Sequence, residues 1–189
     1  MTDSALAETR AWVERAVIGL QLCPFAKAPQ VKGQVRYVAS DAVDADALLS
    51  DLVDELKLIA AAPPDRIETT LLVHPRVLAD FEDHNDFLEI AEAALVALDL
   101  EGVIQIASFH PDYRFAESEP DDIANATNRS PYPTLHLLRE ESIERALAGF
   151  GDPDSIFEAN IATMERLGAE GWAALRRRCR DDAGRPAES

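Results

Sequence analysis

Cysteine, basic residues and long apolar runs are all scarce in this sequence, and each scarcity excludes a class of protein. The two cysteines, Cys23 and Cys179, lie far apart in the chain. They allow neither a disulfide framework nor a zinc knuckle, which favours a reducing cytoplasm. No apolar run approaches the ~18 residues that cross a membrane. The opening MTDSALAETR also lacks the basic-then-apolar pattern of a signal peptide. We therefore expect a cytoplasmic protein that does not enter membranes.

Basic residues are few, because 18 Lys and Arg stand against 35 Asp and Glu, for a formal net charge of -17. Nucleic-acid binding and docking on anionic membranes both rely on cationic surface, so both are disfavoured. The acidic residues gather on two helical segments without calcium-loop spacing, and we interpret them as solvated faces. Glycine-rich phosphate loops are absent too, since neither GxGxxG nor GxxxxGK[ST] occurs.

Apolar periodicity predicts alternating strands and helices in a chain of 189 residues, the size of one domain. Strands are expected at 35–39, 68–74, 103–109 and 134–138. Helices are expected from the N-terminus to Cys23, from Asp44 or Asp46 to Pro63, and at 80–98, 154–167 and 171–180. This alternation indicates an α/β fold, a two- or three-layer sandwich of about four mainly parallel strands with flanking helices. We expect a single domain over 1–180 and a disordered tail over 181–189.

The most informative segment runs from Ser108 to Glu140, SFHPDYRFAESEPDDIANATNRSPYPTLHLLRE. It contains two of the four His, two of the three Tyr and three Arg, spaced by prolines. Long structured loops of this composition are usually functional. The segment therefore predicts where a site lies, without naming its reaction.

His110 follows the strand VIQIASF directly, at its carboxyl end. Ligands of open α/β sheets bind outside the carboxyl ends of strands, so His110, Asp112 and Tyr113 are site candidates. Imidazole can act there as acid, base or metal ligand, and the alternative is a histidine that hydrogen-bonds a turn.

Polar side chains in NATNRSPYP form a rigid donor array suited to a carboxylate or phosphate. The residues are Asn125, Asn128, Arg129 and Ser130. The competing interpretation is that the asparagines close turns.

His136 and Arg139 lie in the expected strand TLHLLRE. His136 points into the crevice of His110 if the two strands are neighbours, and otherwise it is a structural histidine. Arg139 either holds a ligand or pairs with Glu140, Glu141 or Glu144.

A metal site could be assembled from His110, Asp112, His136 and either Glu68 or His74, although no HxH, HxxxH or HExxH spacing is present. Cys23 ends a helix just before Pro24, where a thiolate is not stabilised, so we interpret it as a structural thiol and an outside candidate for a nucleophile.

Five motifs are spread over most of the chain: Trp12, LCPFA at 22–26, ETTLLVHP at 68–75, QIASFHPDYRFA at 105–116 and NRSPYPTLHLLRE at 128–140. Together they resemble a bacterial family known as domain of unknown function 1415. The resemblance implies a compact, free-standing cytoplasmic protein. It supplies no reaction, cofactor or catalytic residue.

Three functions are compatible with these residues. The first is a small-molecule enzyme in which His110 and His136 transfer protons, Tyr113 is a secondary donor, and Asn125, Asn128, Arg129 and Arg139 hold a carboxylate or phosphate. The second is metal or haem binding through the two histidines. The third is a non-catalytic protein-binding domain, which predicts an exposed apolar patch around Tyr132 and Pro133. Cofactor, substrate and oligomeric state remain open at this stage.

Overall fold

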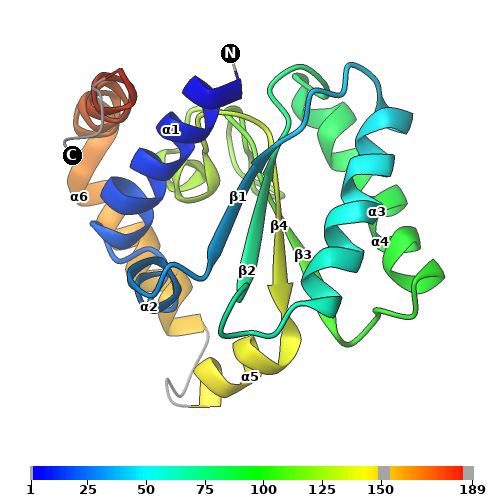
Figure 1. The fold of residues 1–189 in the computed structure, drawn as a ribbon. Coiled ribbons are helices and arrows are strands. Elements are labelled where there is room, and N and C mark those ends of the chain that lie inside the picture. Colours follow the sequence, from blue (N-terminus) through cyan, green and yellow to red (C-terminus); the bar gives the residue numbers. More distant parts are fainter. Residues whose placement is uncertain (1, 149–153, 185–189) are drawn as a thin grey trace.

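The computed structural model describes residues 2–148 and 154–184 of the chain. One four-stranded sheet forms the middle of the molecule, and helices cover both of its faces (Figure 1). On one face lie α3 (Ala45–Ala61) and α4 (Phe81–Ala97), and on the other α1 (Thr2–Trp12) and α6 (Asp154–Ala183). The arrangement is a three-layer α/β sandwich.

The sheet has the order β1-β2-β4-β3, and only one of its three strand pairs is parallel. Its strands are β1 (Val35–Ala39), β2 (Thr69–Val73), β3 (Ile104–Phe109) and β4 (Thr134–Arg139). Strand positions agree with the sequence prediction, but the expectation of mainly parallel strands was wrong. β1, β2 and β3 do run in one direction; β4 inserts between β2 and β3 and runs against both.

The connection from β3 to β4 explains this insertion. A parallel connection needs a crossover, usually a long helix, that returns the chain to the opposite edge of the sheet. Residues 110–133 contain only the short 3₁₀ helix η2 (Ile123–Asn128). The chain therefore stays at the edge where β3 ends, and β4 enters from that edge in the antiparallel direction.

Local signals fix the helix ends on the α3/α4 face. The Asp44 carboxylate accepts the backbone N–H of Ala47 at 2.8 Å, which selects Asp44 over Asp46 as the N-cap of α3. Asp80 caps α4 in the same way, with Glu82 N at 2.9 Å. The apolar faces of both helices pack on Leu72, Leu135 and Leu137 to form the larger core.

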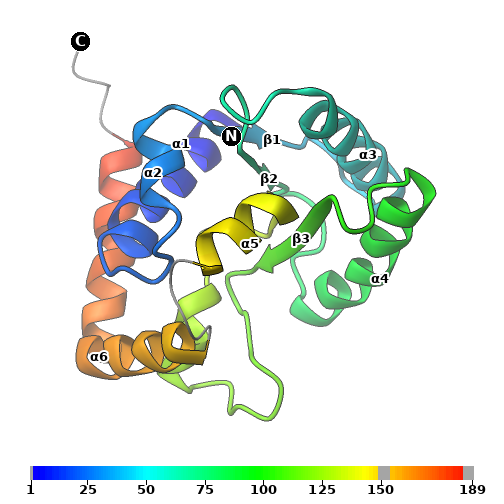
Figure 2. The same cartoon turned by 90° about the horizontal axis from the view of Figure 1, so that it is seen from below.

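The α1/α6 face carries a second core, built around Trp12, Leu71, Met164 and Trp172. The helix expected from the N-terminus to Cys23 corresponds to α1 and the π-helical segment η1 (Val13–Ile18). Two helices lay outside the sequence prediction: α2 (Lys27–Val31), and α5 (Glu140–Ala148), which follows directly on β4 at the end of the sheet (Figure 2).

The C-terminal helix α6 corresponds to the two helices expected at 154–167 and 171–180. Gly168, at φ 66° and ψ 173°, interrupts the helical backbone between them. A positive φ of this kind favours glycine. α6 continues to Ala183, so 181–183 of the expected tail are helical; Gly184 forms a turn, and 185–189 lie outside the described residues. Among the described helices, none is long and apolar enough to cross a membrane.

Candidate functional site

The loop that joins β3 to β4 is held in shape by Asn125, a fully buried residue. Its Oδ1 accepts Phe115 N at 2.9 Å and Ser118 Oγ at 2.8 Å, and its Nδ2 donates to Glu119 O at 2.8 Å. Both the oxygen and the nitrogen of the Asn125 amide therefore have their hydrogen-bond partners within the loop. The geometry supports the turn-closing interpretation of Asn125 over a ligand contact.

The two arginines expected to hold a ligand instead donate to backbone carbonyls. Arg129 Nε donates to Tyr113 O at 3.1 Å, and its Nη2 donates to Pro120 O at 2.7 Å. Arg139 Nη2 donates to Ile59 O and Ala62 O, both at 2.7 Å. Arg139 thereby satisfies the carbonyls that are left free at the C-terminal end of α3.

The remaining predicted residues of this loop have less defined roles. Asn128 accepts His110 N through its backbone oxygen at 3.3 Å. The ring of Tyr113 packs between Phe81 and Phe115, with centroids at 5.4 and 5.1 Å.

The loop offers no exposed Tyr-Pro patch of the kind expected for a protein-binding domain, because Pro133 is buried and the Tyr132 hydroxyl donates to Glu8 at 3.2 Å.

His110 and His136 lie on opposite faces of the sheet. His136 pairs with Ala107 in β3 and shares its face with Phe109, whose ring lies 5.8 Å away on the α1/α6 side. His110 follows Phe109 and therefore points to the other face. There it contacts His84 of α4 at a ring-centroid distance of 5.1 Å. A site that uses both histidines is not formed.

His136 is instead tied to its own sheet. Its Nε2 lies 2.7 Å from Thr69 Oγ1, and the Thr69 hydroxyl donates to Leu137 O at 2.7 Å. The threonine proton is thus committed, so Nε2 of His136 carries the proton of this bond. Burial lowers the pKa of His136 to about 4. The residue is neutral at pH 7.

Three histidines, His74, His84 and His110, gather where β2 and β3 end, and all three are fully buried. The His74 and His84 rings stack at 5.3 Å. His110 accepts Asp112 N on Nδ1 at 3.1 Å and donates from Nε2 to Leu78 O at 3.3 Å. Both nitrogens of His110 are therefore used within the fold.

The other two histidines of this cluster keep unpartnered nitrogens among the described residues: Nε2 of His74 and both nitrogens of His84. Burial lowers the pKa of His74 to about 4 and that of His84 to about 3. The sequence does carry a signal for this cluster, since VHP at 73–75 and FHP at 109–111 both place a His-Pro pair at a strand end. His84 gave no signal, because it lies in an acidic helical stretch.

In the part of the chain that the structure describes, the side chains that could bind a metal ion do not come together as a ligand set. No group of three or more His, Cys, Asp or Glu side chains is placed to hold an ion there. The ligands expected from the sequence are also divided, because His136 faces away from His110 and Asp112.

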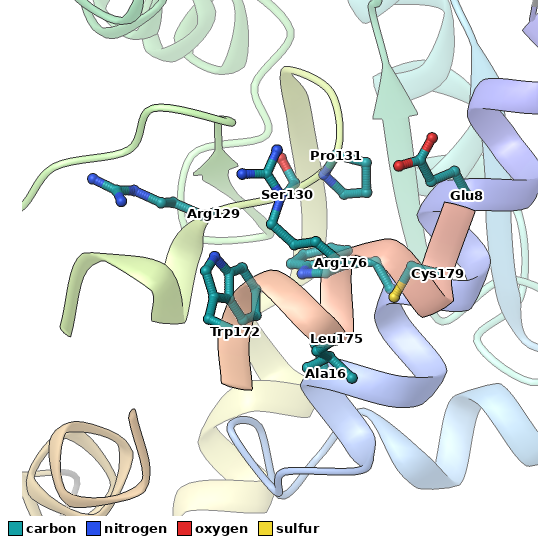
Figure 3. A pocket seen from close by; sticks show the side chains of 10 residues that line it. Glu8, Ala16, Arg129, Ser130, Pro131, Trp172, Leu175, Arg176 and Cys179 are labelled. Atoms are coloured by element: carbon teal, nitrogen blue, oxygen red, sulfur yellow. The ribbon is translucent and has the colours of Figure 1, made fainter. Parts of the chain in front are cut away.

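A different constellation lies between α1, α6 and the segment that precedes β4 (Figure 3). We call it the Trp–Arg crevice. Its enclosed part measures about 10 Å³, room for one water-sized group. It is lined by Glu8, Trp12, Ala16, Arg129, Ser130, Pro131, Trp172, Leu175, Arg176 and Cys179.

Two indole N–H groups in the Trp–Arg crevice are buried without a hydrogen-bond partner among the described residues. They belong to Trp12 and Trp172, which are 3% and 6% exposed. Figure 3 shows the nitrogen of Trp172 pointing toward the segment of Arg129 and Ser130. Indole nitrogen can only donate, and a buried donor without an acceptor is costly by ~1–3 kcal/mol. The crevice is thus short of acceptors.

Arg176 brings an exposed positive charge to the Trp–Arg crevice. Arg176 makes no hydrogen bond or ion pair with any residue that the structure describes. Its side chain reaches across the crevice toward Ser130 (Figure 3). Burial lowers the pKa of Arg129; the carboxylate of Asp112 opposes this, and the charge of Arg176 adds to it.

Glu8 is the one acidic side chain among the described residues that line the Trp–Arg crevice. Figure 3 places its carboxylate at the opposite end from the guanidinium of Arg176. It already accepts the Tyr132 hydroxyl. Glu8 therefore leaves the charge of Arg176 unpaired. The sequence signal for this region is the run RRRCR at 176–180, which stands out in a chain of net charge -17.

Fold and crevice together define a three-layer α/β protein with a small, donor-lined and positively charged pocket beside its sheet. The chain belongs to the family described as "Protein of unknown function (DUF1415)", which matches residues 4–174. The match confirms the resemblance carried by the motifs and extends into α6. Comparison with curated proteins and with solved structures gives no significant match.

Proposed function

We propose that this protein binds a small molecule through one oxyanion, a carboxylate or phosphate, in the Trp–Arg crevice. The observation that carries the proposal is that two buried indole N–H groups without a partner among the described residues, those of Trp12 and Trp172, belong to side chains that line one crevice together with Arg176. Charged and neutral donors that line one cavity favour an anionic ligand.

The size of the crevice limits how the ligand enters. An enclosed volume of about 10 Å³ admits one oxygen atom or a similar group, not a whole metabolite. The remainder of the ligand would lie at the mouth, where Arg176 is exposed. This favours a ligand whose anionic group is terminal.

From the sequence, the anion is expected to be held by Arg129, Asn125, Asn128 and Arg139. We now assign this role mainly to Arg176. Arg129 contributes positive charge from the crevice wall while its guanidinium donates to the loop. Proton transfer by His110, His136 and Tyr113 stays a prediction, and the two histidines cannot share one site because they lie on opposite faces of the sheet. The proposed function is therefore binding, and no reaction is assigned.

A cytoplasmic location remains part of the proposal. Both cysteines are free thiols, as a reducing compartment maintains them. The proposed partner is a small molecule, and nothing in the crevice calls for nucleic acid or a membrane.

Thermal unfolding tests the proposal in a series of anions at constant ionic strength. A ligand that binds only the folded state raises the melting temperature in a concentration-dependent way. Phosphate, acetate and succinate should raise it relative to chloride, while the cation choline should not. An identical melting temperature in all of these salts would rule the crevice out as an anion site.

A further inference from the structure

A second and larger cleft lies where η1 ends and α6 begins. Its volume is about 610 Å³, and it shares no lining residue with the Trp–Arg crevice. Small-molecule sites in proteins commonly measure ~300–1,000 Å³. We call it the Cys23 cleft, after the thiol in its wall.

The lining of the Cys23 cleft is divided between apolar and polar side chains. Ile18, Pro24, Ile156 and Ala159 form its apolar part, and Gln21, Lys27 and Asn160 are among its polar groups. A mostly apolar wall with a few polar groups is typical of small-molecule sites, because area gives affinity and the polar groups fix orientation.

Charge in this cleft has one sign. Lys27 is the only charged side chain among the described residues that line it, and no described acid accompanies it there. In a chain with 35 acidic residues this is unusual. Lys27 is thus the side chain in this lining that can pair with an anion.

The backbone beside the cleft is held in an uncommon conformation. Gln21 has φ 57° and lies three residues after Ile18, where the π-helical segment η1 ends. A non-glycine residue at positive φ costs roughly 1 kcal/mol and persists only where its surroundings enforce it. Asn160 is one such constraint, because its Nδ2 donates to Leu22 O at 2.9 Å and ties this turn to α6.

The thiol of Cys23 is held in its neutral form. Burial raises the pKa of Cys23, and the backbone N–H of Phe25 only partly offsets this. A neutral thiol is a poor nucleophile. Cys23 thus acts as a soft apolar contact in the wall, and a covalent step is not part of the inference.

We propose that the Cys23 cleft is a binding site for a small amphipathic carboxylate. Its apolar body would lie against Ile18 and Ile156, and its carboxylate would pair with Lys27. The inference is independent of the proposed function, since it rests on other residues and on a separate cavity.

Alkylation of Cys23 by iodoacetamide, followed by peptide mass spectrometry, tests the inference on the unmodified protein. Octanoate is the probe, and octanol and inorganic phosphate are the matched comparisons. Octanoate should slow the modification of Cys23 several-fold, whereas octanol and inorganic phosphate should not. Equal protection by octanol, or none by octanoate, would overturn the proposal.

Two variants locate the effect. Lys27→Gln should weaken protection by octanoate about tenfold, the effect of losing one charged contact. Lys32→Gln is the control, since Lys32 is also exposed but does not line the cleft. Ala159→Phe fills the cleft from an exposed position, so Cys23 should react slowly even without octanoate, octanoate should slow it no further, and the melting temperature should be retained. Undiminished protection in Ala159→Phe would place octanoate elsewhere and overturn the proposal.

Discussion

Trp172 and Arg176 lie one helical turn apart on α6, and both direct hydrogen-bond donors toward the segment of Arg129 and Ser130 (Figure 3). Residues four positions apart share one face of a helix. Trp12 adds a third donor from the opposite helix, buried and unpartnered like Trp172. The crevice between α1 and α6 therefore combines a guanidinium with two neutral donors, and this combination is the basis of the proposed function.

Replacement of Arg176 should remove anion binding without harming the fold. Arg176→Ala deletes an exposed side chain that has no partner among the described residues, so unfolding free energy should change by less than about 0.5 kcal/mol. The stabilisation by phosphate or succinate should disappear. Arg178→Ala is the control, because it removes the same charge from the same helix outside the crevice. If both variants lost the stabilisation by phosphate or succinate equally, the anions would be acting on the overall positive charge of the helix and not at the crevice.

Arg139 should prove to be a structural residue. Arg139→Ala leaves carbonyls of Ile59, Ala62 and Ile67 without their donor, and the predicted loss is about 2–4 kcal/mol of unfolding free energy. Urea denaturation measures it. Arg145→Ala breaks only an exposed pair with Glu141 and should cost about 0.5 kcal/mol or less. An Arg139→Ala protein of unchanged stability would restore Arg139 as a candidate ligand contact.

Asn125 should control the order of the loop between β3 and β4. Asn125→Ala removes the acceptor of Phe115 N and Ser118 Oγ, so the loop should become sensitive to limited proteolysis. Asn85→Ala, at an exposed position on α4, should leave the cleavage pattern unchanged. Resistance of the Asn125→Ala loop to protease would show that other contacts hold it.

Acid should destabilise the fold through its buried histidines. The pKa values of His74 and His84 fall from 6.5 in the unfolded chain to about 4 and about 3 in the fold. Below pH 6.5 the unfolded chain therefore binds more protons, and stability declines as pH falls toward 4. Each such histidine contributes a slope of about 1.4 kcal/mol per pH unit in this window.

His84→Leu tests this account, because leucine cannot titrate. Urea denaturation between pH 7 and pH 4.5 should give a shallower decline for the variant, by about one proton. Asp80 and Asp112 favour the charged form of the neighbouring His110, so His84 is the cleaner position for the test. An unchanged slope would mean that His84 titrates near its ordinary pKa in the fold.

Much of the local structure was predictable from the sequence, because strands such as TTLLV and caps such as Asp44 are encoded within a few residues. The place of β4 was not, since it depends on pairing between strands far apart in the chain. The Trp–Arg crevice was missed for the same reason: Trp12 and Trp172 come from opposite ends of the sequence. Asn125 and Arg129 were expected to hold a ligand, but their amide and guanidinium groups hydrogen-bond within the loop itself.

The central claim can be tested most directly by intrinsic tryptophan fluorescence, because both tryptophans of the chain line the Trp–Arg crevice. We predict that titration with phosphate or succinate at constant ionic strength changes the emission in a saturable way in the wild type and in Arg178→Ala. Arg176→Ala should show no such change. A flat titration of the wild type, or a saturable one that survives Arg176→Ala, would contradict the assignment of this crevice as an oxyanion site.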